Sequence, residues 1–134
     1  MEKLEGYIAR FAESAGHNWD ADGMRLVMPV GQGGRHQDIK VERIGEDYVM
    51  TSVVLGTAQV TRSSKTWRVL AKLAWHRNAD NEIVTFAFDR RDRLVGQVRH
   101  PAAHLDYEEF ELYAEVLARE CDRFEYVLSG GDRF

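Results

Sequence analysis

The sequence is poor in several residue types, and each scarcity excludes a class of protein. The 134 residues include one cysteine and two prolines. A single cysteine, Cys121, can form no internal disulfide and supplies no cysteine-based zinc site. Few prolines, together with 44% hydrophobic residues, argue against a disordered chain. We therefore expect a single domain, residues 1–134, with its own hydrophobic core.

Positive charge and long apolar runs are also lacking. The net charge is −4, which argues against a broad basic surface for nucleic acid or anionic membranes. No apolar run approaches the roughly 20 residues of a membrane-spanning helix. Met1–Glu5 carries acidic residues and no apolar segment typical of a secretory signal. These absences predict a cytoplasmic protein that contacts neither nucleic acid nor membrane directly.

What the sequence does contain is an ordered series of hydrophobic patterns. Apolar residues recur at helical or strand spacing in eight segments, and polar stretches separate them. The series α-β-β-β-α-β-β-α predicts an α+β fold, an antiparallel sheet with helices packed mainly on one face. The predicted helices are residues 2–15, 65–77 and a long C-terminal helix that begins at an Asp106–Glu109 capping box; the predicted strands are residues 24–30, 35–44, 48–55, 82–89 and 93–100.

Candidate catalytic motifs all have simpler structural interpretations. His100 and His104 are four residues apart, but Pro101 between them rules out a helical metal-binding pair. Gly31–Gly34 is not followed by the Lys-Ser/Thr of a phosphate-binding loop and is interpreted as a hairpin turn. Glutamates 108, 109 and 111 occupy the first turns of a helix, where its dipole favours negative charge. We therefore predict no catalytic, metal or cofactor site, and no enzyme activity.

The middle helix carries more large apolar residues than a small sheet can cover. Trp67 and Trp75 are eight residues apart, about two helical turns, and Leu70 and Leu73 lie between them. Large apolar residues in excess of the core often mark an interface. The alternative is that both tryptophans cover the edges of the core.

Three segments carry a resemblance to a known family. The hairpin Asp89–Val98 has a charged turn, Pro101 follows it, and Asp106–Glu111 opens a long helix. This arrangement resembles the type III secretion chaperone-like superfamily, in particular its YbjN-like branch, although classical members are often more acidic than −4. The resemblance implies a non-catalytic homodimer without cofactors that binds extended segments of partner proteins. It also implies a role in stress responses or regulation, or in a DNA-damage response through a single-stranded-DNA-binding protein.

With a homodimer and a partner protein implied, residues can be assigned to both interfaces. Because Pro29 cannot donate a backbone hydrogen bond, the strand 24–30 either lies at an edge or ends there, and as an edge it could accept a partner strand by backbone hydrogen bonding. Flexible methionines suit varied partners, and the first helix can lie beside this edge. The predicted partner-binding residues are Tyr7, Phe11, Met24 and Met28, and the predicted dimer interface comprises Trp67, Leu70, Leu73, Trp75, Phe86 and Phe88.

Two other functions are compatible with the same residues. The first is a small-ligand-binding or enzymatic α+β domain with a pocket between sheet and helices. The second is direct binding of single-stranded nucleic acid, by aromatic stacking and by the cluster Arg90, Arg91, Arg93 and Arg99.

Overall fold

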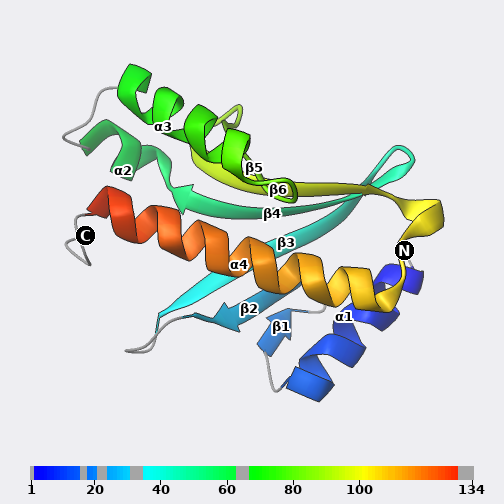
Figure 1. Ribbon diagram of the computed structural model, residues 1–134. Coiled ribbons are helices and arrows are strands. Elements are labelled where there is room, and N and C mark those ends of the chain that lie inside the picture. Colours follow the sequence, from blue (N-terminus) through cyan, green and yellow to red (C-terminus); the bar gives the residue numbers. More distant parts are fainter. Residues whose placement is uncertain (1, 16–17, 21–23, 31–34, 63–66, 130–134) are drawn as a thin grey trace.

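The protein folds around one antiparallel sheet with helices gathered mainly on one of its faces (Figure 1). The computed structural model describes residues 2–15, 18–20, 24–30, 35–62 and 67–129. The sheet has six strands in the order β1-β2-β3-β4-β6-β5, and every neighbouring pair is antiparallel. This confirms the predicted α+β class. The elements in chain order are α1 (Glu2–Ala15), β1 (Asn18–Asp20), β2 (Arg25–Pro29), β3 (His36–Ile44), β4 (Asp47–Leu55), α2 (Thr57–Arg62), α3 (Trp67–Asp80), β5 (Thr85–Phe88), β6 (Leu94–Pro101), the 3-10 turn η1 (Ala102–His104) and α4 (Tyr107–Ser129).

The long helix α4 crosses one face of the sheet and closes the core (Figure 1). Its buried stripe recurs at helical spacing and comprises Phe110, Ala114, Leu117, Cys121 and Phe124. Facing it, β3 alternates buried Gln37, Ile39 and Val41 with exposed residues, as a half-buried strand should. Each fully buried large side chain contributes about 1.5–3 kcal/mol through removal from water. No helix in the described part of the chain is both long and apolar enough to span a membrane.

The predicted capping box is present at the start of α4. The backbone N–H of Glu109 donates to the Asp106 carboxylate (2.8 Å), and the Glu109 carboxylate accepts from the Asp106 N–H (3.2 Å). Two donors that the helix itself cannot satisfy are thereby paired. The cap fixes the residue at which α4 begins, and with it the side of the helix that faces the sheet.

The hairpin between β5 and β6 is organised by one carboxylate. Asp89 accepts from the backbone N–H groups of Arg91 and Arg93 (both 2.9 Å) and pairs with the Arg93 side chain (2.7 Å). Burial alone would raise the pKa of Asp89, but the hydrogen bonds and charge from Arg93 and Arg91 lower it below its usual value. The turn therefore favours the ionised carboxylate.

Two elements depart from the predicted order. The polar segment before β2 forms β1, which pairs with β2 from Asn18↔Val27 to Asp20↔Arg25. The prediction that residues 24–30 form an edge strand is therefore wrong, because β2 has β1 on one side and β3 on the other, whereas the alternative, that the strand ends at Pro29, is confirmed. The connector after β4 forms the short helix α2. The predicted turn 31–34 lies outside the described residues.

Helix α1 contacts the neighbouring strand β1 and also distant parts of the chain. Lys3 donates to the carbonyl of Ala102 (3.2 Å) and the Tyr7 hydroxyl to that of Leu105 (3.1 Å). The apolar stripe of α1, Leu4, Ile8 and Phe11, is fully buried. Two hydrogen bonds of α1 therefore reach η1 and Leu105 just after it, about a hundred positions later in the chain.

Candidate functional site

The outer flank of α3 carries the most exposed aromatic side chains of the described residues. Trp67 is 60% exposed and Trp75 64% exposed. The Trp67 ring stacks on Phe88 of β5, with centroids 5.6 Å apart. We call Trp67, Trp75 and Phe88 the α3–β5 patch. Such exposure of tryptophan is unusual in a monomer and is typical of a surface that another molecule covers.

The predicted dimer-interface residues divide between this patch and the core. Leu70 is fully buried beside Ala74 on the face of α3 turned inward, and Phe86 is 2% exposed. The Phe86 ring packs edge-to-face on Phe124 of α4, with centroids 5.0 Å apart. The assignment of Leu70 and Phe86 to an interface is therefore corrected, because both side chains fill the core of their own chain. Leu73 is partly buried and faces a groove rather than the patch.

The predicted partner-binding residues divide in the same way. Phe11 and Met28 are buried in the core, so neither can touch a partner directly, and their assignment is corrected. Tyr7 and Met24 are partly buried and pack against that core. Tyr7 already uses its hydroxyl to hold α1 on Leu105. Of the four predicted partner-binding residues, only Tyr7 and Met24 are therefore accessible to a partner.

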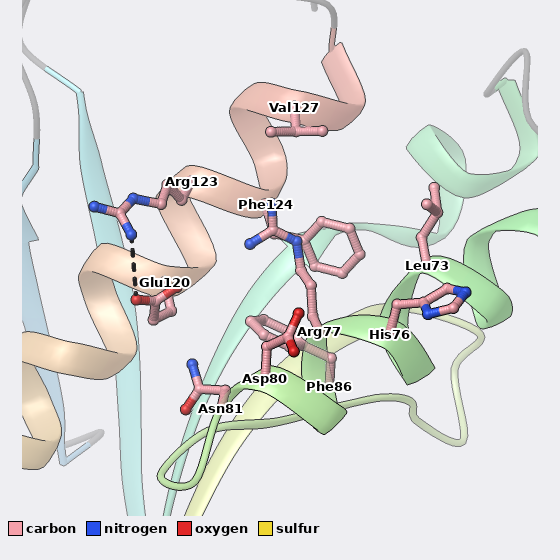
Figure 2. Close-up of a pocket in the computed structure, with 10 residues that line it drawn as sticks. All are labelled: Leu73, His76, Arg77, Asp80, Asn81, Phe86, Glu120, Arg123, Phe124 and Val127. Atoms are coloured by element: carbon pink, nitrogen blue, oxygen red, sulfur yellow. Dashed lines mark ion pairs between the residues drawn. The ribbon is translucent and has the colours of Figure 1, made fainter.

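A groove of about 450 Å³ lies between α3 and the C-terminal half of α4 (Figure 2). Phe86 and Phe124 lie at its centre in Figure 2, and the Arg77 guanidinium lies over the Phe124 ring at 4.6 Å. Arg123 pairs with Glu120 at 3.6 Å on one side of the groove. The volume is in the range of small-ligand pockets. Much of its polar lining, however, is engaged within the protein, since Arg77 lies on an aromatic ring and Arg123 pairs with a carboxylate.

A polar chain runs through the core beneath α4. The Gln37 amide donates to the Glu125 carboxylate (2.8 Å), and the Ser52 hydroxyl lies 2.8 Å from the Gln37 amide oxygen. The Cys121 thiol donates to the Ser52 carbonyl (3.8 Å). Burial raises the pKa of Cys121 to about 12, so the thiol stays neutral and is not a nucleophile. These hydrogen bonds fix α4 on the sheet and form no catalytic arrangement.

The histidines do not assemble a metal site in the described part of the chain. Within those residues, no three His, Cys, Asp or Glu side chains lie where they could hold one ion. His100 instead pairs with Glu109 (3.3 Å) and lies beside the Tyr113 ring. Burial, and next the carboxylates of Glu109 and Asp106, raise the pKa of Tyr113, which therefore remains a neutral phenol.

The arginine cluster of the second hairpin is partly neutralised. Arg93 pairs with Asp89, and Arg99 pairs with Asp47, each at 2.7 Å. Arg90 and Arg91 are exposed at the turn. Because two of the four guanidiniums face carboxylates, this surface lacks the concentrated positive charge that backbone phosphates require.

Sequence patterns missed the role of one residue in this region, Asn78. The predicted middle helix ended at Arg77, whereas α3 continues to Asp80 and thus includes Asn78. The Asn78 side chain makes two hydrogen bonds to the backbone of β5. An asparagine after an apolar arc is normally interpreted as the end of a helix, so no periodicity could have identified this contact.

Comparisons with known proteins identify the fold. No family model matches the sequence, and no curated protein is similar to it in sequence. Among solved structures, a chain of the ExsC–ExsE complex has a TM-score of 0.65 and 18% identity, covering 95% of this chain and 94% of that one. YbjN from E. coli has a TM-score of 0.59 and 15% identity, covering 92% and 86%. The type III secretion chaperone SycH of Yersinia pestis, solved with a fragment of YscM2, has a TM-score of 0.55 and 10% identity, covering 94% and 99%. The chain therefore has the fold of type III secretion chaperones and of YbjN, as its sequence predicted.

Proposed function

We propose that this chain, which shares its fold with YbjN and with type III secretion chaperones, is a non-catalytic, chaperone-like module that binds a partner protein as a homodimer. The observation that carries the proposal is the pair of tryptophans on α3, each more than half exposed. Two of the similar folds were solved as complexes with other proteins, ExsC with ExsE and SycH with a YscM2 fragment. An exposed aromatic surface, on a fold that binds other proteins in those complexes, favours protein binding over catalysis.

The second copy is proposed to cover the α3–β5 patch. Trp67 and Trp75 are both exposed on α3, and Phe88, on which Trp67 stacks, extends the apolar surface onto β5. Indole rings are rigid and large, so a two-fold contact between two such patches removes much apolar area from water at low entropic cost. Leu70 and Phe86 do not contact the second copy; they are buried in the core and support α3 and β5 beneath the patch.

Changing both tryptophans to aspartate should abolish the dimer. Trp67→Asp with Trp75→Asp places two charges where apolar burial is required, and losing one tryptophan hot spot alone costs about 2 kcal/mol or more of binding. Sedimentation velocity should therefore give a dimer for the wild type and a monomer for the double variant. Leu112→Asp, at a 47% exposed position of α4, is the matched control and should remain dimeric. A wild type that is monomeric throughout, or a double variant that stays dimeric, would contradict the proposed interface.

The partner is proposed to bind at the opposite end, along α1 and β1. Since β1 is the outer strand at this end, strand addition would occur there rather than on β2. Tyr7 and Met24 are the predicted contact residues that remain accessible, while Phe11 and Met28 support them from the core. We further propose that the partner acts in a cytoplasmic stress or DNA-damage response, with a single-stranded-DNA-binding protein as the first candidate to test.

Lysine cross-linking should separate the two surfaces in one experiment. Lys3 is exposed on α1 and Lys72 on α3. After capture of a partner by the tagged full chain, mass spectrometry should show partner links to Lys3 and, within the dimer, links between the two copies of Lys72. Partner links confined to Lys72 would contradict the assignment of the α1–β1 end. Single-stranded DNA that binds the chain without a protein, with an affinity that falls steeply with salt, would favour the nucleic-acid alternative instead.

A further inference from the structure

One sheet edge of this protein is closed by side chains rather than by another strand. Among the strands of the described residues, β5 pairs only with β6 and is the outer strand at its end of the sheet. The Asp89 N–H donates to the Arg93 carbonyl across the turn (2.9 Å), so position 89 faces β6. Backbone groups alternate in direction along an antiparallel strand. The N–H and C=O groups of Phe86 and Phe88 therefore point away from β6, toward the side on which a further strand would lie.

Asn78 of α3 occupies that side at Phe86. The Phe86 N–H donates to the Asn78 side-chain oxygen (2.6 Å), and the Asn78 side-chain nitrogen donates to the Phe86 carbonyl (2.9 Å). These are the two hydrogen bonds that a residue of a neighbouring strand would make. One amide side chain therefore takes the place of a strand at the centre of β5.

The segment leading into β5 is closed by a second asparagine. The Asn81 side-chain oxygen accepts from the N–H groups of Ile83 and Val84, at 3.0 and 2.9 Å. At the other end of β5, the Trp67 ring lies on Phe88. An uncovered edge strand is a template for pairing with any extended chain. Here Asn78 caps that edge at Phe86, Asn81 caps the segment that precedes it, and the Trp67 ring contacts the Phe88 side chain.

We propose that Asn78 determines what kind of partner this end of the molecule accepts: it denies β5 to extended strands and leaves the neighbouring α3–β5 patch to a folded surface that binds through side chains. The inference rests on the proposed protein-binding function, and it adds that one class of partner, the extended segment, is excluded from this surface. A client segment in extended form is kept from the dimer side of the molecule. Without Asn78, two copies could join their sheets edge to edge through β5.

Amide hydrogen exchange in the unmodified full chain provides the first test. Phe86 and Phe88 face the same way, but among the described residues only Phe86 has a side chain bonded to its backbone. The Phe86 amide should exchange about tenfold more slowly than the Phe88 amide, because its hydrogen bond must open first. Equal exchange at the two positions would overturn the inference, and this measurement needs no variant to fold.

Asn78→Ala provides the second test, with Asp80→Ala as the matched control in the same turn of α3. At low concentration, Asn78→Ala should speed exchange at Phe86 about fivefold or more, since the capping bond is gone. At high concentration it should form species larger than the wild type in sedimentation velocity, with Phe86 protected again by the new pairing. Wild-type exchange and wild-type mass in Asn78→Ala would overturn the inference. Because protection of Phe86 is measured on the free chain, it stands or falls independently of whether the tryptophans form a dimer.

Discussion

Gly96→Ala is expected to destabilise this protein by about 3 kcal/mol, the upper part of the usual range for overpacking a core. A Cβ atom at position 96 would lie 2.5 Å from the Cys121 sulfur, 3.1 Å from a ring carbon of Phe86 and 3.2 Å from a methyl carbon of Val84. All three are buried, so none can move aside freely. The close approach of α4 to β6 therefore requires glycine at this position. Urea denaturation monitored by circular dichroism would measure the loss.

Two further variants make this prediction specific. Gly6→Ala, in α1, is the matched control, because a Cβ there has no neighbour within 4 Å. It should be neutral or stabilising by up to about 1 kcal/mol, since alanine favours a helix more than glycine does. Adding Cys121→Ala to Gly96→Ala should recover part of the lost stability, because the closest atom is removed. A Gly96→Ala variant as stable as the wild type would show that α4 does not approach β6 so closely.

Phe110→Ala is expected to cost about 3–5 kcal/mol, as truncation of a fully buried aromatic side chain does. Phe110 has no exposed surface and its ring contacts those of Tyr7 and Phe11 from α1, with centroids 5.7 and 6.1 Å away. The cavity would open at the junction of α1 and α4. Beyond lower stability in urea, we expect faster amide exchange throughout α1 than in the central strands.

The control for this variant lies two residues further along the same helix. Leu112 is 47% exposed, so Leu112→Ala should change stability by no more than about 0.5 kcal/mol. A similar loss in Leu112→Ala and Phe110→Ala would contradict the aromatic junction as the source of the lost stability. Slower exchange in α1 than in the sheet would likewise contradict the role given to Phe110.

The sequence predicted most of the elements because their burial is periodic. The stripe from Phe110 to Phe124 in α4 and the alternation in β3 both arise from facing one core, and a period can be identified without knowing what lies opposite. β1 has only three residues, too few to establish an alternation. Helix α2 buries no residue and is supported locally, where the Gln59 side chain accepts from the Gly56 N–H (2.8 Å). Neither element has a hydrophobic pattern that could have predicted it.

The candidate site was predicted only in part, for a related reason. Helical spacing groups residues on the α3 surface but does not say which part of a wide apolar arc faces the sheet. The small residue Ala74 lies at the buried face with Leu70, whereas the larger Trp75 beside it is exposed. Where strands pair depends on contacts distant in sequence, so neither the capped edge of β5 nor the interior place of β2 could be predicted.

The attachment of α1 has a consequence for the order in which the chain becomes ordered during synthesis. Its side chains bond to Ala102 and Leu105, and its Tyr7 ring packs against that of Phe110, about a hundred residues downstream. Helix α1 therefore completes its docking late, because loop closure over such a distance must wait for the synthesis of α4. Until then Leu4, Ile8 and Phe11 lack part of their cover. During its own synthesis, a protein proposed to bind the surfaces of others therefore exposes the apolar face of α1.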